Sequence, residues 1–213
     1  MEALSNFLSN PLLGLALIII MGALIIPIYR ALRHRQQGNR WPEFAVRHGL
    51  TFNASNNTIS GQYRGKPVMM EVYYASSGAA GRPVSQPMTR VAVTVANASQ
   101  GYLNASIGYG IDDNQLAAAN RLAASRGMNM HYVHTGDKEI DRKVAISAPS
   151  GGFADRVLAG SDSIRQAVLS TSGTLILEGQ QLRYEWSGIE SKAEKLQFAL
   201  DLVSDMAEVI ERI

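Results

Sequence analysis

The chain has 213 residues, of which 46% are hydrophobic and 18% are charged, and it contains no cysteine. The lack of thiols excludes a disulfide framework, a cysteine-ligated zinc or iron–sulfur site and a thiol nucleophile. The first 40 residues carry a net charge of +3, whereas residues 41–213 carry 16 basic and 17 acidic side chains, so no surplus of Lys and Arg marks the larger part as a nucleic-acid binder.

An apolar stretch from Pro11 to Tyr29 predicts a transmembrane helix. It has no ionisable side chain before Tyr29, and a helix of this length rises about 28 Å, close to the hydrocarbon thickness of a bilayer. A cleaved signal peptide would need a basic beginning, a shorter apolar stretch and a small-residue cleavage site, and the sequence shows none of these. We therefore expect residues 1–10 to be a short extracytoplasmic segment and residues 11–29 to be an uncleaved anchor.

Basic residues flank only one side of this span. The stem of residues 30–40 contains Arg30, Arg33, Arg35 and Arg40, whereas only Glu2 precedes the span. Cytoplasmic loops hold the excess of Lys and Arg, so we expect a single-pass protein of the cell inner membrane with its N-terminus outside and residues 41–213 in the cytoplasm. The arginines could also contact anionic lipid headgroups in the bilayer, but their effect on topology explains them without that contact.

The next part of the chain, up to residue 107, shows one short helix and then a strand pattern. Trp41, Phe44 and Ala45 give the helix at 41–48 an apolar face, and Gly49 suits its C-terminal end. Period-two alternation then predicts strands at 50–52, 58–63, 68–74, 89–96 and 102–107. The strands at 58–63 and 68–74 form a hairpin, residues 75–87 form a loop rich in small residues, and residues 102–107 are the expected partner of 89–96.

Helices dominate the remaining sequence. Asp112 or Asp113 caps a helix that runs to about Arg126, and residues 152–169 are helical with a break at Gly160–Ser161. Further strands are expected at 128–133, 143–147, 174–177 and 182–186, the last two as a hairpin. From Leu196 to Ile213 the apolar residues repeat at helical spacing, and Ser191 with Glu194 is expected to form the capping box of this long amphipathic helix.

This order of elements predicts the fold class. Hairpins outnumber parallel crossover units, which favours an α+β fold. We expect an N-terminal transmembrane helix followed by a mainly antiparallel sheet packed by helices, with the long C-terminal amphipathic helix on one face of the sheet.

Several segments of the larger domain resemble a known group of proteins. The segments are WPEFAVRHGLTF, ISGQYRGKPVMMEV, TGDKEIDRKVAIS, FADRVLAGSDSIRQAVLS and TLILEGQQLRYEWSG. Together they resemble an uncharacterised bacterial family of single-span membrane proteins with a cytoplasmic α+β domain, and the resemblance covers most of residues 41–213. Members often have Phe where this chain has Ile140. The family has no established activity, so the resemblance implies a fold and a location but no catalytic residue.

The histidines do not predict a metal site. His131 and His134 are three residues apart in an expected strand, so they point to opposite sides of it, while His34 lies in the stem and His48 ends a helix. The five methionines Met69, Met70, Met88, Met128 and Met130 could bind a soft metal ion, but methionines that alternate in strands are more often core filler. We therefore predict no metal and no cofactor.

Acidic residues are explained by local structure. Asp112 and Asp113 cap a helix, Asp137 follows Gly136 in a turn, and Asp141 is expected to hold that turn through bonds from its side chain to the backbone. No pairing of Ser, His and Asp can be argued from spacing. Residues 61–66 differ from a phosphate-binding loop in length, and they lead into a strand where such a loop requires a helix. We predict no catalytic residues, although ionisable side chains clustered in a cleft would favour an enzyme.

These observations favour a non-enzymatic, membrane-anchored interaction protein that serves as an accessory subunit of a membrane protein complex. Its expected partners are the lipid bilayer and a membrane protein. The alternative is a membrane-tethered small-molecule or lipid-sensing domain, in which a curved sheet under a helix encloses an apolar pocket lined by Tyr63, Met70 and Tyr74. The sequence does not fix the oligomeric state.

Overall fold

The structure is a computed structural model that describes residues 40–77, 84–96, 101–128 and 130–213. The chain divides into two units, Met1–Arg40 and Trp41–Ile213. The expected span at residues 11–29 lies outside the described residues, as do Arg30, Arg33 and Arg35, whereas Arg40 is an exposed residue that opens the first described helix. Among the helices of the described ranges, none combines the length and the apolar character that crossing a membrane requires.

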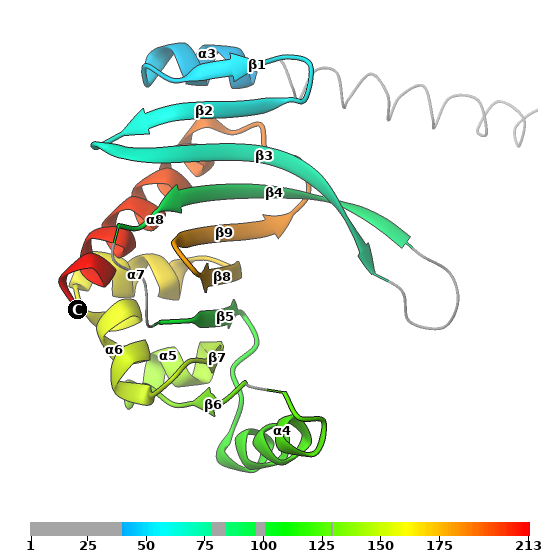
Figure 1. The fold of residues 1–213 in the computed structure, drawn as a ribbon, viewed down its shortest axis with the longest axis vertical. Coiled ribbons are helices and arrows are strands. Elements are labelled where there is room, and N and C mark those ends of the chain that lie inside the picture. Colours follow the sequence, from blue (N-terminus) through cyan, green and yellow to red (C-terminus); the bar gives the residue numbers. More distant parts are fainter. Residues whose placement is uncertain (1–39, 78–83, 97–100, 129) are drawn as a thin grey trace, which may run out of the picture. The chain divides into compact units, whose positions relative to one another are not determined.

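The larger unit contains one nine-stranded sheet in which all neighbouring strands are antiparallel (Figure 1). The strands are β1 (Thr51–Asn53), β2 (Thr58–Tyr63), β3 (Lys66–Ser77), β4 (Val84–Thr94), β5 (Leu103–Ile107), β6 (Tyr132–Val133), β7 (Val144–Ser147), β8 (Gly173–Glu178) and β9 (Gln181–Ser187). Their order across the sheet is β1-β2-β3-β4-β9-β8-β5-β7-β6. The predicted α+β class with a mainly antiparallel sheet is confirmed for this unit.

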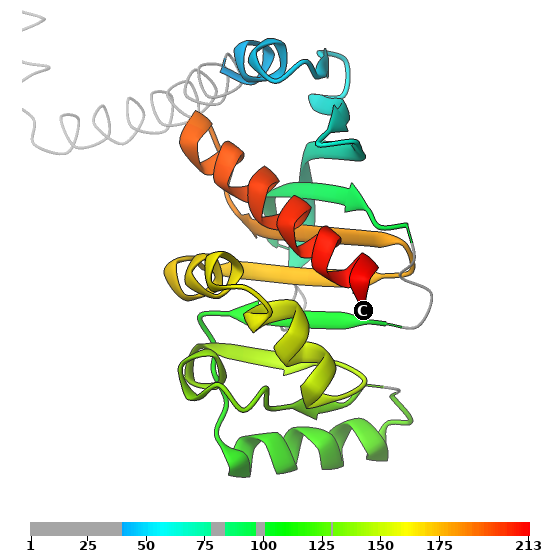
Figure 2. The same ribbon diagram turned by 90° about the vertical axis from the view of Figure 1, so that its left-hand side faces the viewer.

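Helices cover one face of the sheet. The described helices are α3 (Arg40–Arg47), α4 (Asp113–Ser125), α5 (Lys138–Lys143), α6 (Gly151–Ala159), α7 (Asp162–Ser170) and α8 (Ala193–Arg212). Figure 2 shows α8, α7 and α6 lying across the strands, and α8 buries an apolar stripe that includes Leu196, Leu200 and Val203. Each strand alternates between this core and the opposite face, as β5 does with Leu103, Ala105 and Ile107 inward.

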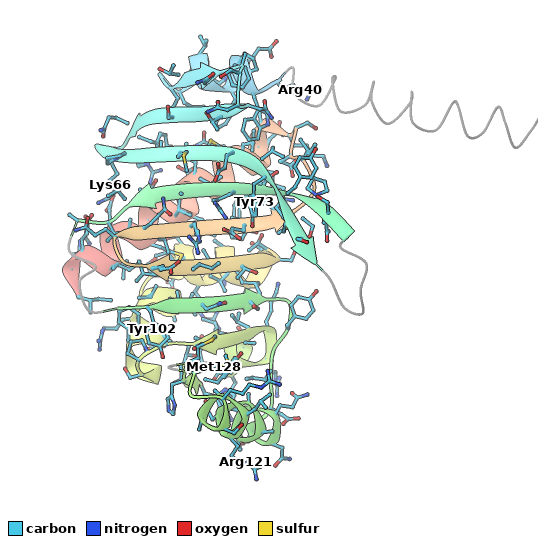
Figure 3. The ribbon with its side chains drawn as sticks, turned by 45° about the vertical axis from the view of Figure 1, so that its right-hand side comes forward. Arg40, Lys66, Tyr73, Tyr102, Arg121 and Met128 are labelled. Carbon is cyan, nitrogen blue, oxygen red and sulfur yellow. The ribbon has the colours of Figure 1, made fainter. Side chains whose placement is uncertain are left out.

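The opposite face of the sheet carries none of the described helices. Figure 3 shows this face with its side chains, and the β3–β4 hairpin curves across one end of it. The strand register places Met69, Ala92, Arg183 and Ile176 in one row across β3, β4, β9 and β8. We call this surface the open face. It has the polar character expected of a solvated side of an antiparallel sheet.

Two predictions about the strands are wrong, one about pairing and one about length. Strand β4 pairs with β9 rather than with β5, whose neighbours are β7 and β8. The alternation of β5 suits any central position, so local sequence does not distinguish these partners. The expected loop at 75–87 is also too long, because β3 continues to Ser77 and β4 begins at Val84. Backbone ladder bonds hold the small residues there in strand conformation.

Three local predictions also need correction. The strand expected at 128–133 comprises only Tyr132–Val133, and the turn before β7 contains the helix α5. The capping box of Ser191 and Glu194 is wrong, because Lys192 occupies the cap position of α8 without a side-chain bond. Instead, the Glu190 carboxylate accepts hydrogen bonds from the backbone N–H groups of Ser191 and Lys192 at 3.0 Å each. These donors precede the first turn, so Glu190 orders the chain as it enters α8 but does not bond the N–H groups that a cap side chain would.

Candidate functional site

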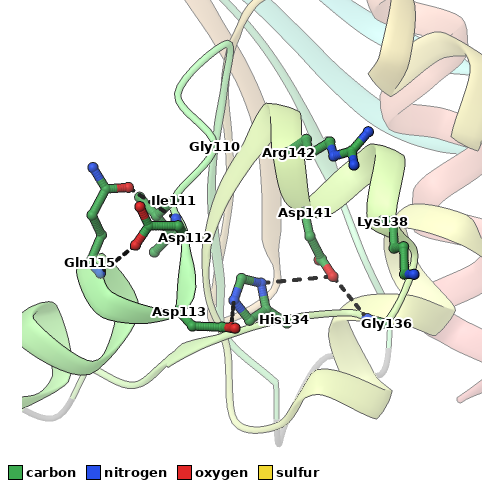
Figure 4. A pocket seen from close by; sticks show the side chains of 10 residues that line it. All are labelled: Gly110, Ile111, Asp112, Asp113, Gln115, His134, Gly136, Lys138, Asp141 and Arg142. Atoms are coloured by element: carbon green, nitrogen blue, oxygen red, sulfur yellow. Dashed lines mark hydrogen bonds and ion pairs between the residues drawn. The ribbon is translucent and has the colours of Figure 1, made fainter.

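A cavity of about 670 Å³ lies between the start of α4 and the segment that leads from β6 into α5 (Figure 4). Its lining consists of Gly110, Ile111, Asp112, Asp113, Gln115, His134, Gly136, Lys138, Asp141 and Arg142. We call it the His134 cavity. Six of these side chains are ionisable, and Ile111 is the one large apolar group among them, so the cavity suits a polar ligand rather than a hydrocarbon chain.

The start of α4 forms one wall, and its geometry follows from a capping box. The Asp112 carboxylate accepts from the backbone N–H of Gln115 at 2.8 Å, and the Gln115 side-chain oxygen accepts from the backbone N–H of Asp112 at 2.9 Å. The predicted capping role of Asp112 is therefore confirmed. On the floor, Gly110 packs so tightly that an added Cβ would lie 2.0 Å from the Arg142 carbonyl oxygen. A larger residue there would push α4 and α5 apart.

The opposite wall depends on Asp141. Its Oδ1 accepts from the backbone N–H and the hydroxyl of Thr135, both at 2.8 Å, and its Oδ2 accepts from the backbone N–H of Gly136 at 3.1 Å. The predicted role of Asp141 in holding this turn is confirmed. Next to it, Asp137 caps α5 and pairs with Arg165. The Arg165 guanidinium holds the pKa of the Asp137 carboxyl below its ordinary value.

His134 lies between two carboxylates. Its Nε2 is 3.1 Å from Asp113 Oδ1, and its Nδ1 is 3.7 Å from Asp141 Oδ2. Opposite edges of the ring therefore face different acids, so these three side chains cannot bind one ion together. Within the described ranges, no group of three His or carboxylate side chains is arranged to hold a metal.

The cavity meets the condition that would favour an enzyme, since ionisable side chains cluster in it. Two of its carboxylates are already engaged, Asp112 as a helix cap and Asp141 by three hydrogen bonds. Its lining includes no Ser, Thr, Cys or Tyr that could act as a nucleophile. Lys138 and Arg142 make no ion pair with any described residue. The arrangement can bind a polar molecule, and His134, whose Nε2 is 3.1 Å from Asp113 Oδ1, is placed for proton transfer.

A second polar feature, a row of alternating charges, crosses the open face. Arg90 on β4 bonds Glu71 at 2.8 Å and Glu185 at 2.7 Å, and Arg183 extends the row to Glu178 at 2.9 Å. The Tyr73 hydroxyl donates to Glu185 at 2.6 Å, and burial together with this bond raises the pKa of Tyr73. Sequence reasoning missed this row because its members belong to strands whose pairing was not known.

The apolar pocket expected around Tyr63, Met70 and Tyr74 is not formed. Met70 is fully buried in the core, and Tyr74 is 63% exposed. Tyr63 instead bonds to Asp201 on α8 at 2.7 Å. The three residues therefore have different surroundings, namely the core, the solvent and a polar contact with α8, and they do not line a common cavity.

Comparisons with known proteins give one structural likeness. No protein family's sequence profile matches the chain, and the curated proteins yield no match. The structure is similar to the crystal structure of the mycobacterial trehalose monomycolate transport factor A, TtfA, with a TM-score of 0.53 and 11% sequence identity. The alignment covers 83% of this chain and 95% of that chain. At this identity the likeness shows a shared fold.

Proposed function

We propose that this protein is a non-enzymatic accessory protein of a membrane protein complex. In this proposal residues 11–29 hold it at the inner membrane. We also propose that it belongs to the bacterial single-span family that its segments resemble. Arg30, Arg33, Arg35 and Arg40 would keep residues 41–213 on the cytoplasmic side. In this position the domain would contact a membrane protein close to the bilayer. The fold is also that of a protein named a transport factor, which supports an accessory role in a lipid-related process.

The proposal rests on the composition of the open face. It presents polar and charged side chains over four adjacent strands, among them the Glu71–Arg90–Glu185 row. Half-buried Met69 and Ile176 lie in the neighbouring row. Arg90, Arg183 and Met69 on this face are of residue types that are enriched at protein interfaces. Fixed charges also give such an interface its specificity and register.

Site-directed photo-crosslinking in intact membranes tests the proposal. A photoreactive residue at Gln62 or Gln181 would lie on the open face, and one at Asp162 or Glu194 would lie on the helical side as a matched control. We expect a crosslinked membrane protein from the open-face positions and none from the controls. Equal products from both sides, or none from the open face, would contradict the proposed docking surface.

The His134 cavity favours a second candidate function, a membrane-tethered domain that senses a small molecule or a lipid headgroup. The side chains of Lys138 and Arg142 provide donors, and Asp113, whose side chain is 96% exposed, provides an acceptor. Such a lining suits a headgroup with hydroxyls or with charges of both signs. Pull-down of lipids by the full chain followed by mass spectrometry tests this, with Arg142→Ala as the variant and Arg121→Ala on α4 as its control.

Protease protection tests the location separately. Protease added outside intact spheroplasts should leave the domain of residues 41–213 uncut, and lysis should expose it. Digestion from outside would contradict the proposed orientation, whatever the partner is.

A further inference from the structure

A second cavity, of about 420 Å³, lies beside the end of α4 and combines the sulfur and imidazole groups of one short segment. Its lining consists of Tyr102, Asn120, Ala124, Met128, Met130, His131 and Pro149. We call it the methionine cavity. Figure 3 labels Tyr102 and Met128 at the end of the molecule that carries α4. His131 lines this cavity and His134 lines the other one, as expected for histidines on opposite sides of the chain.

The methionines of this cavity differ from those of the core. Met70 and Met206 are fully buried in the main cluster, where they fill space between strands and helices. Met128 is 44% exposed, and Met130 is half-buried. Methionine is one of the residues most often buried in proteins, so two that line a solvent cavity together are not explained as core filler.

The donor set of the cavity selects a class of ligand. Two thioether sulfurs and one imidazole are its strongest ligating groups, and no Asp, Glu, Lys or Arg belongs to the lining. Hard cations such as Ca²⁺ and Mg²⁺ need carboxylate or carbonyl oxygens, and structural zinc sites need thiolates or several histidines. Thioethers select soft ions, above all Cu(I). We propose that Met128, Met130 and His131 bind one Cu(I) ion in this cavity.

The backbone at His131 and Tyr132 is held in place from three directions. The backbone N–H of His131 donates to the Tyr102 hydroxyl oxygen at 3.2 Å, and the backbone N–H of Ala148 donates to the His131 carbonyl at 3.0 Å. Asn120 on α4 bonds both backbone groups of Tyr132, at 2.7 and 2.9 Å. The imidazole therefore projects from a fixed backbone, while the unbranched methionine side chains can adjust around an ion.

Competition for Cu(I) tests the proposal with the full chain in detergent under anaerobic conditions. The protein is titrated against the coloured complex of Cu(I) with bicinchoninate, and the wild type should withdraw one ion per chain. Met128→Leu and Met130→Leu keep the size and apolar character of the side chains, as does the control Met69→Leu on the open face. Changes that only disturb the surroundings of a metal lower its affinity by about 10- to 100-fold, so each ligand variant should lose at least tenfold and the control should not change.

Silver provides a second readout that does not depend on competition with a chelator. Ag(I) is a diamagnetic ion with the same ligand preference, and it should shift the methyl NMR signals of Met128 and Met130 but not that of Met69. Failure of the wild type to withdraw Cu(I), equal Cu(I) binding by the wild type and the Met128→Leu, Met130→Leu double variant, or preferential binding of Zn²⁺ would each overturn the proposal. The crosslinking experiment on the open face is unaffected by any of these outcomes.

Discussion

Tyr63 on β2 donates its hydroxyl hydrogen to Asp201 Oδ1 on α8 over 2.7 Å, although the two residues are 138 positions apart in the chain. The Gln197 side-chain amide donates to both groups at 2.8 Å, and Arg64 pairs with the same carboxylate at 2.7 Å. Burial and the bond to Asp201 raise the pKa of Tyr63, so the phenol remains a donor at neutral pH. This cluster attaches the β2–β3 hairpin to the helix that covers the sheet.

Replacing Tyr63 by Phe should therefore weaken the attachment. The variant loses the hydrogen bonds to Asp201 and Gln197 but keeps the ring, so we expect the free energy of unfolding to fall by about 1 kcal/mol. Urea unfolding of the full chain in detergent measures this loss. Tyr74→Phe is the matched control, since the Tyr74 side chain is largely exposed, and it should unfold at the wild-type urea concentration. A Tyr63→Phe midpoint equal to that of the wild type would show that the cluster contributes no net stability.

Thr89 is a buried polar residue whose role the sequence does not reveal. Its hydroxyl donates to the Gly188 carbonyl at 2.7 Å and accepts from the backbone N–H of Glu190 at 3.0 Å. Thr89→Val should cost about 2 kcal/mol of unfolding free energy, because two partly buried backbone groups lose their hydrogen bonds to a buried side chain. Thr94→Val, exposed on the same strand, should change the stability little. Similar midpoints for the two variants in urea would contradict this role.

The elements that were predicted correctly from the sequence are those whose turns or ends are marked by residues within the element or next to it. The β8–β9 hairpin surrounds Gly179, which has a φ of +58°, and a turn residue of this kind between two alternating stretches fixes the pairing by itself. Asp112 and Gly127 similarly define both ends of α4. The pairing of β4 with β9 has no such signal, because 95 positions separate Arg90 from its partner Glu185, and apolar alternation alone suits several neighbours.

The candidate sites were less predictable than the fold for the same reason. The turn held by Asp141 could be predicted, since its partners Thr135 and Gly136 are near it in sequence. The His134 cavity could not, because it arises where the start of α4 meets the start of α5. Met128, Met130 and His131 were visible as residue types, but only their exposure separates them from the core methionines.

A substitution at Gly110 tests whether the His134 cavity depends on the close packing of Gly110 against Arg142. In Gly110→Ala the new methyl group would meet the Arg142 carbonyl at 2.0 Å, and backbone cannot move as a flexible side chain does. We expect a loss of about 1–3 kcal/mol in unfolding free energy, the usual cost of overpacking. Gly152→Ala is the control, since its Cβ would have no neighbour closer than 4.0 Å. An unchanged urea midpoint for Gly110→Ala would show that α4 shifts without cost.

The ion pair of Asp137 and Arg165 predicts how the free energy of unfolding changes with pH. Arg165 Nε donates to Asp137 Oδ2 at 2.6 Å, and this guanidinium, together with two backbone N–H donors, lowers the pKa of the Asp137 carboxyl in the folded protein. An unfolded Asp has a pKa of about 3.9. The stabilisation is therefore complete above that pH and is lost as the pH falls towards the lower folded pKa, because the unfolded state takes up the proton first.

Arg165→Met should flatten this dependence, since without the guanidinium the folded and unfolded pKa values of Asp137 move closer together. The free energy of unfolding is measured in urea at intervals from pH 6 to pH 3, and the readout is its slope against pH rather than its value at one pH. Arg212→Met removes an exposed ion pair with Glu208 within α8, and because surface pairs of this kind contribute little, it should keep the wild-type slope. A wild-type slope in Arg165→Met would mean that the backbone N–H groups, and not Arg165, hold the pKa of Asp137 down.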